Sequence, residues 1–163
     1  MDPFEQAISK IFSHAFCRVC FLPSRIVCPD IAIERELLSR LRAALAEREH
    51  AMRVINLRPA PVARLRQLTE ELPEWNDPTP DEPVPLMRVV VGMDRLDSNE
   101  RQGAAGAFKV RFDNSSSGLL WLFIGRDAAK MERLFYSHSW PLYATAFDCT
   151  PEAWRTEIPG GWG

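Results

Sequence analysis

Apolar residues along this chain follow two kinds of spacing, one typical of helices and one typical of buried strands. Segments near Pro3–His14 and from Asp30 to Arg48 place their apolar side chains on one face at 3.6-residue spacing. In contrast, three valines at positions 89–91 are consecutive, which is typical of a parallel strand buried on both faces. The alternation of these two patterns predicts helices and strands in turn.

Residues that start and stop elements sharpen this prediction. Asp30 suits a helix N-cap, and Pro61 suits the first position of a helix. Strands are predicted at Phe16–Leu22, Met52–Leu57, Leu86–Met93, Gly118–Ile124 and Leu142–Phe147. Helices are predicted near Pro3–His14, from Asp30 to Arg48, after Pro61 and at Asp127–Ser137, with a weaker signal at Glu100–Val110.

The order of elements indicates an α/β fold with three layers. We expect a mostly parallel, five-stranded sheet flanked by helices, in a single domain spanning residues 1–163. Prolines and acidic residues in Pro73–Pro85 exclude helix and central strand, so this segment is expected to be an exposed loop. Residues 156–163 are expected to form a loose C-terminal tail.

Composition and charge narrow the function classes. Apolar residues make up 46% and charged residues 26%, as in globular proteins, and the net charge of −2 gives no basic footprint for direct nucleic-acid binding. No stretch approaches the roughly 18 apolar residues of a membrane span, and the N-terminal residues lack the apolar core of a secretion signal. We therefore expect a cytoplasmic protein without membrane contact, with its four cysteines reduced.

The first glycine of the chain is Gly92, and this position excludes a glycine-rich phosphate loop after the first strand. Such a loop, GxxxxGK followed by Ser or Thr, wraps phosphates with backbone N–H groups and neutralises them with its lysine. The matching position is Pro23–Asp30 (PSRIVCPD), which has no glycine, no lysine and two prolines that cannot donate backbone hydrogen bonds. Arg25 could contact a phosphate there, but the nest of amides is absent.

Asp94 and Asp97 are the sharpest positive signal. They follow a buried strand in the segment VVVGMDRLDS. Ligands of α/β proteins bind at the C-terminal edge of the sheet, where such carboxylates can hold Mg²⁺ directly or through water. A structural alternative is that the two aspartates cap the following helix or turn and that Arg126 pairs with one of them.

The segment VVVGMDRLDS resembles the Walker B strand of the NACHT and STAND branch of AAA-like P-loop NTPases. The later segment LLWLFIGRDA resembles the sensor strand of that branch, and on this matching Arg126 falls on the sensor arginine. The resemblance covers about Arg53–Phe147 and implies a P-loop NTPase-like domain that is degenerate because it lacks Walker A. Degenerate domains of this kind are associated with prokaryotic conflict and immune systems, where they act as scaffolds or sensors.

These signals favour a non-catalytic scaffold, interaction or sensor module of a bacterial antiviral defence or signalling complex. Its partners would be other proteins, it would need no cofactor or metal, and Asp94, Asp97 and Arg126 would be relic-site residues. The alternative is a nucleotide- or Mg²⁺-dependent hydrolase in which the aspartates hold Mg²⁺ and Arg126 stabilises charge. A small receiver-like or adaptor domain without a ligand is a third interpretation. Arg126 or Arg58 filling the edge near Asp94 would favour either non-enzymatic interpretation.

Trp75, Trp154 and Trp162 are candidates for partner binding, because tryptophan is enriched at protein interfaces and these residues lie in or near Pro-rich or terminal segments. Trp75 and Trp154 could instead fold back over apolar clusters, whereas Trp162 is expected to be exposed.

Cysteine and histidine positions give no strong pattern for a metal or a nucleophile. Cys17, Cys20 and Cys28 look at first like part of a zinc site, but Cys17 and Cys20 in a strand would point to opposite faces. Buried, reduced thiols are the simpler interpretation. His138 has no GxSxG nucleophile elbow to serve, so a hydrolase triad is not supported.

Overall fold

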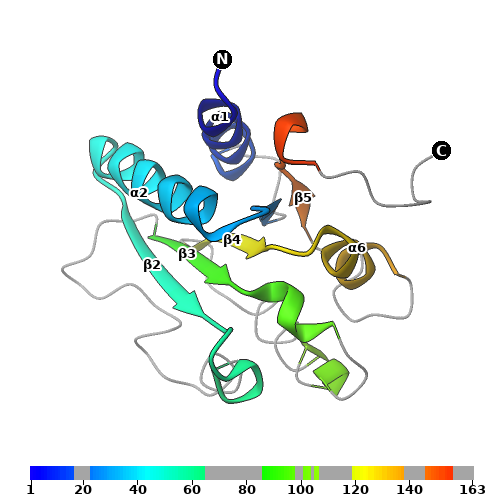
Figure 1. Ribbon diagram of the computed structural model, residues 1–163. Helices are drawn as coiled ribbons and strands as arrows, with labels where there is room; N and C mark the ends of the chain where they lie inside the picture. Colours follow the sequence, from blue (N-terminus) through cyan, green and yellow to red (C-terminus); the bar gives the residue numbers. More distant parts are fainter. Residues whose placement is uncertain are drawn as a thin grey trace.

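The computed structural model describes residues 1–16, 23–64, 86–97, 101–103, 105–106, 119–137 and 146–155. One sheet of five parallel strands organises them, in the order β2-β3-β4-β1-β5 (Figure 1). All strand pairs are parallel. The strands are β1 (Ser24–Val27), β2 (Ala51–Asn56), β3 (Leu86–Val91), β4 (Leu119–Gly125) and β5 (Phe147–Asp148).

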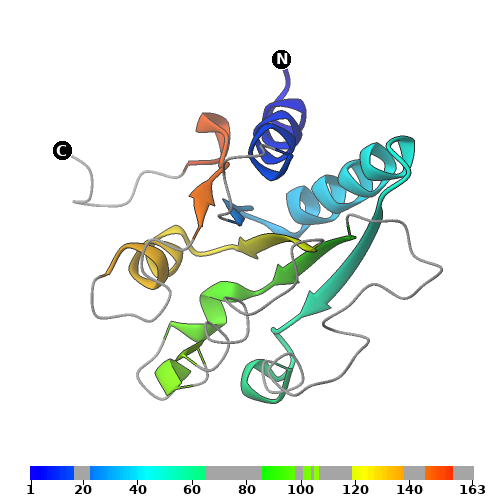
Figure 2. The same cartoon turned by 180° about the vertical axis from the view of Figure 1, so that it is seen from behind.

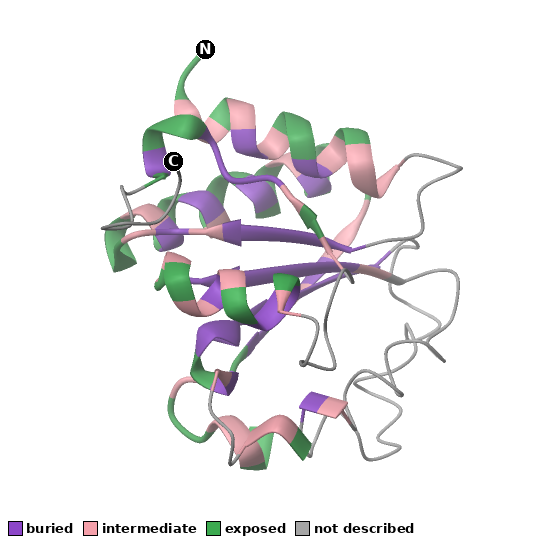
Figure 3. Ribbon diagram, turned by 90° about the vertical axis from the view of Figure 1, so that its right-hand side faces the viewer, coloured by how far each residue is buried: buried purple, intermediate pink, exposed green. Residues whose placement is uncertain are grey.

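Helices cover both faces of the sheet. Two helices, α1 (Pro3–Ala15) and α2 (Ile31–Glu47), lie on one face, and α6 (Ala128–Tyr136) and the 3₁₀ helix η1 (Met93–Leu96) lie on the other (Figures 1 and 2). A further 3₁₀ helix, η3 (Glu152–Trp154), packs beside α1. In the edge-on view the buried strands run between the two helical layers (Figure 3). The predicted three-layer α/β fold is therefore confirmed, and the described sheet is wholly parallel.

The central strands contribute side chains to both layers of the core. Val89 and Val91 pack on the side of α1 and α2, whereas Val90 packs on the side of α6. All three valines are buried, as expected for a strand covered on both faces. The helices supply matching apolar faces. The buried apolar residues of α1, α2 and α6 are Ala7, Ile11, Leu37, Leu41, Leu45, Met131, Leu134 and Phe135.

Aspartates cap the three longest described helices. Asp30 accepts a hydrogen bond from the Ile33 N–H at 2.9 Å, which confirms it as the N-cap of α2. Asp2 caps α1 in the same way through the Glu5 N–H, and Asp127 caps α6 through the Lys130 N–H. These caps fix where each helix begins, so they fix where its first turn meets the edge of the sheet.

The first strand of the described residues lies later in the chain than the first strand that the sequence predicts. Phe16 is the C-cap of α1, and residues 17–22 lie outside the described residues. The described strand β1 is Ser24–Val27, inside the segment Pro23–Asp30 that the sequence matches to the position of a phosphate loop. Its polar residues Ser24 and Arg25 are buried, so the segment lacks the apolar run by which a strand is recognised.

Other boundaries agree in part. Within the predicted fifth strand, Phe147 is described and begins β5, whereas 142–145 lie outside the described residues, as do loop 73–85 and tail 156–163. Residues 61–64 are helical, as Pro61 predicts, and so are parts of the predicted helix 100–110. In the described part of the chain, no helix has the length and apolar composition needed to cross a membrane.

Candidate functional site at the carboxyl edge of the sheet

The connection between β1 and α2 consists of Cys28, Pro29 and Asp30. The Cys28 N–H donates to the carbonyl of Gly125 at 2.9 Å, proline has no N–H, and the Asp30 side chain caps α2. Half of the segment matched to a phosphate loop is thus strand, and the connection from β1 to α2 is shorter than that segment. It offers no nest of backbone N–H groups that could wrap a phosphate.

Arg25 does not lie at this edge as a phosphate contact. Its guanidinium lies over the Tyr136 ring, 4.1 Å from the centroid, and 3.9 Å from the Asp148 carboxylate. The side chain is buried against α6. The suggestion that Arg25 could contact a phosphate is therefore wrong.

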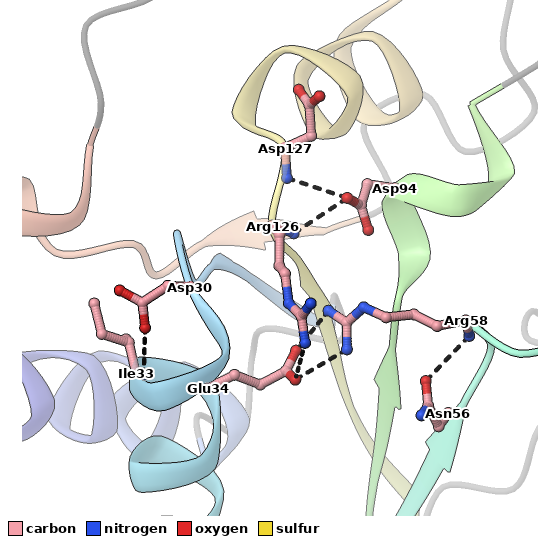
Figure 4. Close-up of polar contacts among 8 residues, drawn as sticks. All are labelled: Asp30, Ile33, Glu34, Asn56, Arg58, Asp94, Arg126 and Asp127. Carbon is pink, nitrogen blue, oxygen red and sulfur yellow. Dashed lines mark hydrogen bonds and ion pairs between the residues drawn. The ribbon is translucent and has the colours of Figure 1, made fainter.

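A carboxylate from α2 and two guanidiniums occupy the edge instead (Figure 4). Arg58, which follows β2, donates to both oxygens of Glu34, at 2.9 and 2.6 Å. Arg126, which follows β4, donates to Glu34 Oε2 at 3.2 Å. The Glu34 side chain is only 6% exposed, against 19% for Arg58 and 33% for Arg126. We call these three residues the Glu34 cluster.

The position of Glu34 within α2 suits this role. It lies in the first turn, where the positive end of the helix dipole stabilises a negative charge. It also lies three, four and seven residues before Leu37, Leu38 and Leu41, so it shares the inward face of the helix. An acidic residue on an apolar helix face was the sequence signal that could have identified it.

Asp94 is held by the start of α6 rather than by an arginine side chain. Its Oδ2 accepts hydrogen bonds from the backbone N–H groups of Arg126, at 3.3 Å, and Asp127, at 3.1 Å. The residue is 8% exposed, and its Oδ1 is buried with no hydrogen-bond partner among the described residues. Asp94 therefore stabilises the turn between β4 and α6. The structural alternative gave it a capping role on the helix or turn that follows it in sequence, whereas the turn it holds is more than 30 residues later. The alternative in which Arg126 pairs with one of the two aspartates is wrong for its side chain, which donates to Glu34.

Asp97 has a different partner from Asp94. Its buried carboxylate pairs with the exposed Arg133 of α6. Within the described residues, no three Asp, Glu, His or Cys side chains are grouped so that they could hold a metal ion. The two aspartates of the Asp-x-x-Asp pair are thus used separately to attach η1 to α6.

Two glycines allow the close packing at this edge. Gly92 has a φ of +87°, and a Cβ there would lie 2.8 Å from Arg58 Cγ. At Gly125 a Cβ would lie 2.5 Å from Met131 Sδ and 3.2 Å from Asp94 Cβ. The first glycine of the chain therefore makes room for Arg58, and the small residue before Arg126 makes room for Asp94.

The tryptophan candidates differ in what the structure describes. Trp154 is buried and packs edge-on against Phe4 of α1, with ring centroids 5.1 Å apart. Its ring thus folds back into the core, and it is not a surface available to a partner. Trp75 and Trp162 lie outside the described residues.

Cys28 and Cys149 are buried free thiols, as the sequence predicts. Burial, with a smaller contribution in the same direction from the nearby Glu34 carboxylate, raises the pKa of Cys28 from 9.0 to about 12. Burial raises the pKa of Cys149 to about 11. Both thiols are therefore protonated at neutral pH and are poor nucleophiles and poor metal ligands. Cys17, Cys20 and His138 lie outside the described residues.

Comparison with protein-family models gives no match, and comparison with curated proteins gives no significant match either. The functional argument therefore depends on the fold and on the contacts at this edge.

Proposed function

We propose that this chain is a non-catalytic scaffold, interaction or sensor module of a cytoplasmic prokaryotic defence or signalling complex, built on a degenerate STAND-like domain. The observation that carries the proposal is the Glu34 cluster. At the edge where α/β proteins bind their ligands, the protein's own carboxylate lies between Arg58 and Arg126.

The arrangement of the strands supports the resemblance on which the proposal depends. The described sheet is wholly parallel, in the order β2-β3-β4-β1-β5, and a parallel five-stranded sheet flanked by helices is what the resemblance implies. Asp94 and Arg126 follow adjacent strands, β3 and β4, as the Walker B aspartate and the sensor arginine do in that family. The short connection after β1 supports loss of the phosphate-binding function.

The hydrolase alternative lacks such support. It requires Asp94 and Asp97 to share a metal ion, but each carboxylate has its own protein partner. It also requires Arg126 to be available to a transition state, whereas its guanidinium donates to Glu34.

Isothermal titration of the wild-type protein with ATP and with ADP, each with Mg²⁺, tests the proposal. We expect no binding heat beyond the Mg²⁺ blank and no phosphate release in a colorimetric assay. Binding in the micromolar range, or measurable turnover, would overturn the non-catalytic assignment.

Affinity capture of partners tests the interaction part. Wild type, Trp162→Ala and Trp154→Phe would be compared, because Trp162 is the surface candidate and Trp154 is a core residue. We expect Trp162→Ala to lose a partner that Trp154→Phe retains. If all three proteins capture the same partners, Trp162 does not contribute to the interface. If the wild-type protein captures no partner, the scaffold role is contradicted.

A further inference from the structure

The Glu34 carboxylate has the geometry of a bound ligand. It comes from the first turn of α2, whereas the guanidiniums that contact it come from residues following β2 and β4 (Figure 4). Arg58 and Arg126 are separated from Glu34 by 24 and 92 residues, so only the sheet brings them together. Guanidinium groups bind carboxylate and phosphate oxygens through the same paired N–H geometry. A phosphate group would therefore meet these arginines in the way that Glu34 does.

The two guanidiniums carry more N–H donors than the Glu34 carboxylate accepts from. The only side-chain hydrogen bond of Arg126 in the described structure is the one from Nη2 to Glu34, and its Nε is buried without a partner. Asp94 forms no ion pair with Arg58 or Arg126 in the described structure, where both guanidiniums pair with Glu34 and the Asp94 Oδ2 accepts from two backbone N–H groups. Without Glu34, two partly desolvated guanidiniums would lie together with no carboxylate directed between them.

We propose that Glu34 fills an oxyanion-binding site formed by Arg58 and Arg126, and that phosphate-type oxyanions bind these arginines once the carboxylate is removed. The inference deepens the proposed function and rests on it, since a self-occupied site explains how the edge can persist without a ligand. The partial exposure of Arg126 gives an incoming anion access from solvent. A purely structural ion pair would differ, because its loss would destabilise the protein without creating affinity for any anion.

The test is chemical rescue of Glu34→Ala by inorganic pyrophosphate. We expect pyrophosphate to raise the melting temperature of Glu34→Ala by several degrees relative to NaCl of equal ionic strength. The Glu34→Ala variant should bind pyrophosphate about tenfold or more tightly than the wild-type protein does. Glu36→Ala is the matched control, because Glu36 lies on the same helix and pairs with the exposed Arg40. It should behave as wild type.

The double variant Glu34→Ala/Arg126→Ala should lose the rescue, because it removes the more accessible guanidinium. Equal rescue of the double variant, or a folded Glu34→Ala that binds pyrophosphate no better than wild type, would overturn the inference. If Glu34→Ala does not fold, the pyrophosphate titration is made on Glu34→Gln instead. Absence of pyrophosphate binding by Glu34→Gln would also overturn the inference.

A parallel titration with ATP distinguishes the source of the phosphate. Tighter binding of ATP than of pyrophosphate would show that the edge also recognises a nucleoside, and equal binding would limit recognition to the oxyanion. Binding of ATP by the wild-type protein would instead count against the proposed function. Failure of the proposed function is therefore distinguished from failure of the oxyanion-site inference, which is measured on Glu34→Ala.

Discussion

Arg58 donates two hydrogen bonds to Glu34, at 2.9 and 2.6 Å, and thereby ties the residues that follow the edge strand β2 to the first turn of α2. Arg126 extends the connection to the end of β4 through the same carboxylate. One buried acidic side chain thus holds together three connections at the edge where a ligand would bind in other α/β proteins.

Glu34→Ala should strongly destabilise the protein. Removing one partner of a buried ion pair leaves the other charges uncompensated, which costs about 3–5 kcal/mol. Urea unfolding followed by circular dichroism would measure the loss, and Glu36→Ala should show little change because its ion pair with Arg40 is exposed. A Glu34→Ala variant as stable as Glu36→Ala would mean that the cluster contributes nothing to folding.

Gly92→Ala should destabilise the edge through two effects. A left-handed backbone conformation costs a non-glycine residue roughly 1–2 kcal/mol, and the new Cβ would lie 2.8 Å from Arg58 Cγ. Gly103→Ala is the matched control, because nothing lies within 4 Å of a Cβ at that helical position. We expect thermal denaturation to show a lower melting temperature for Gly92→Ala and an unchanged or higher one for Gly103→Ala. The opposite order would contradict the assigned role of Gly92.

Asp94→Ala should lower stability, because Asp94 accepts hydrogen bonds from the two N–H groups that precede α6. Loss of hydrogen bonds to a charged group costs about 1.5–3 kcal/mol. Asp97→Ala should cost less, since its partner Arg133 is exposed. Chemical denaturation of both variants measures the difference. If Asp94→Ala kept full stability but abolished a nucleotide-dependent activity, the hydrolase interpretation would replace the structural one.

The buried thiols should make stability depend on alkaline pH. The pKa of Cys28 is raised from 9.0 to about 12, so the folded state keeps its proton where the unfolded chain loses it. The stabilisation is therefore complete below pH 9 and is lost progressively as pH rises from 9 toward 12. Between about pH 8 and pH 10, the stability advantage of wild type over Cys28→Ser should shrink by about 1 kcal/mol.

Alkylation supplies an independent measurement of the same thiols. With iodoacetamide near neutral pH, peptide mapping should show Cys28 and Cys149 unmodified in the folded protein and modified in urea. Rapid modification of either cysteine in the folded protein would show that the thiol is accessible and would refute the burial argument.

Much of the fold follows from local patterns in the sequence. The 3.6-residue spacing of apolar side chains predicts α1 and α2, and the three consecutive valines predict a doubly covered β3. The caps at Asp30 and the start near Asp127 are also local, because a capping side chain bonds a backbone N–H three residues away. β1 has no such local pattern, because its polar Ser24 and Arg25 are buried by partners that the local sequence does not reveal.

The contacts of the candidate site could not be predicted in this way. The sequence by itself determined that no glycine-rich phosphate loop follows the first strand and that acidic and basic residues follow β3 and β4. Only the tertiary structure decided that Arg126 pairs with Glu34 and that Asp94 binds backbone N–H groups. The physical reason is that these partners lie on different strands and helices, and the strand order β2-β3-β4-β1-β5 sets which of them meet.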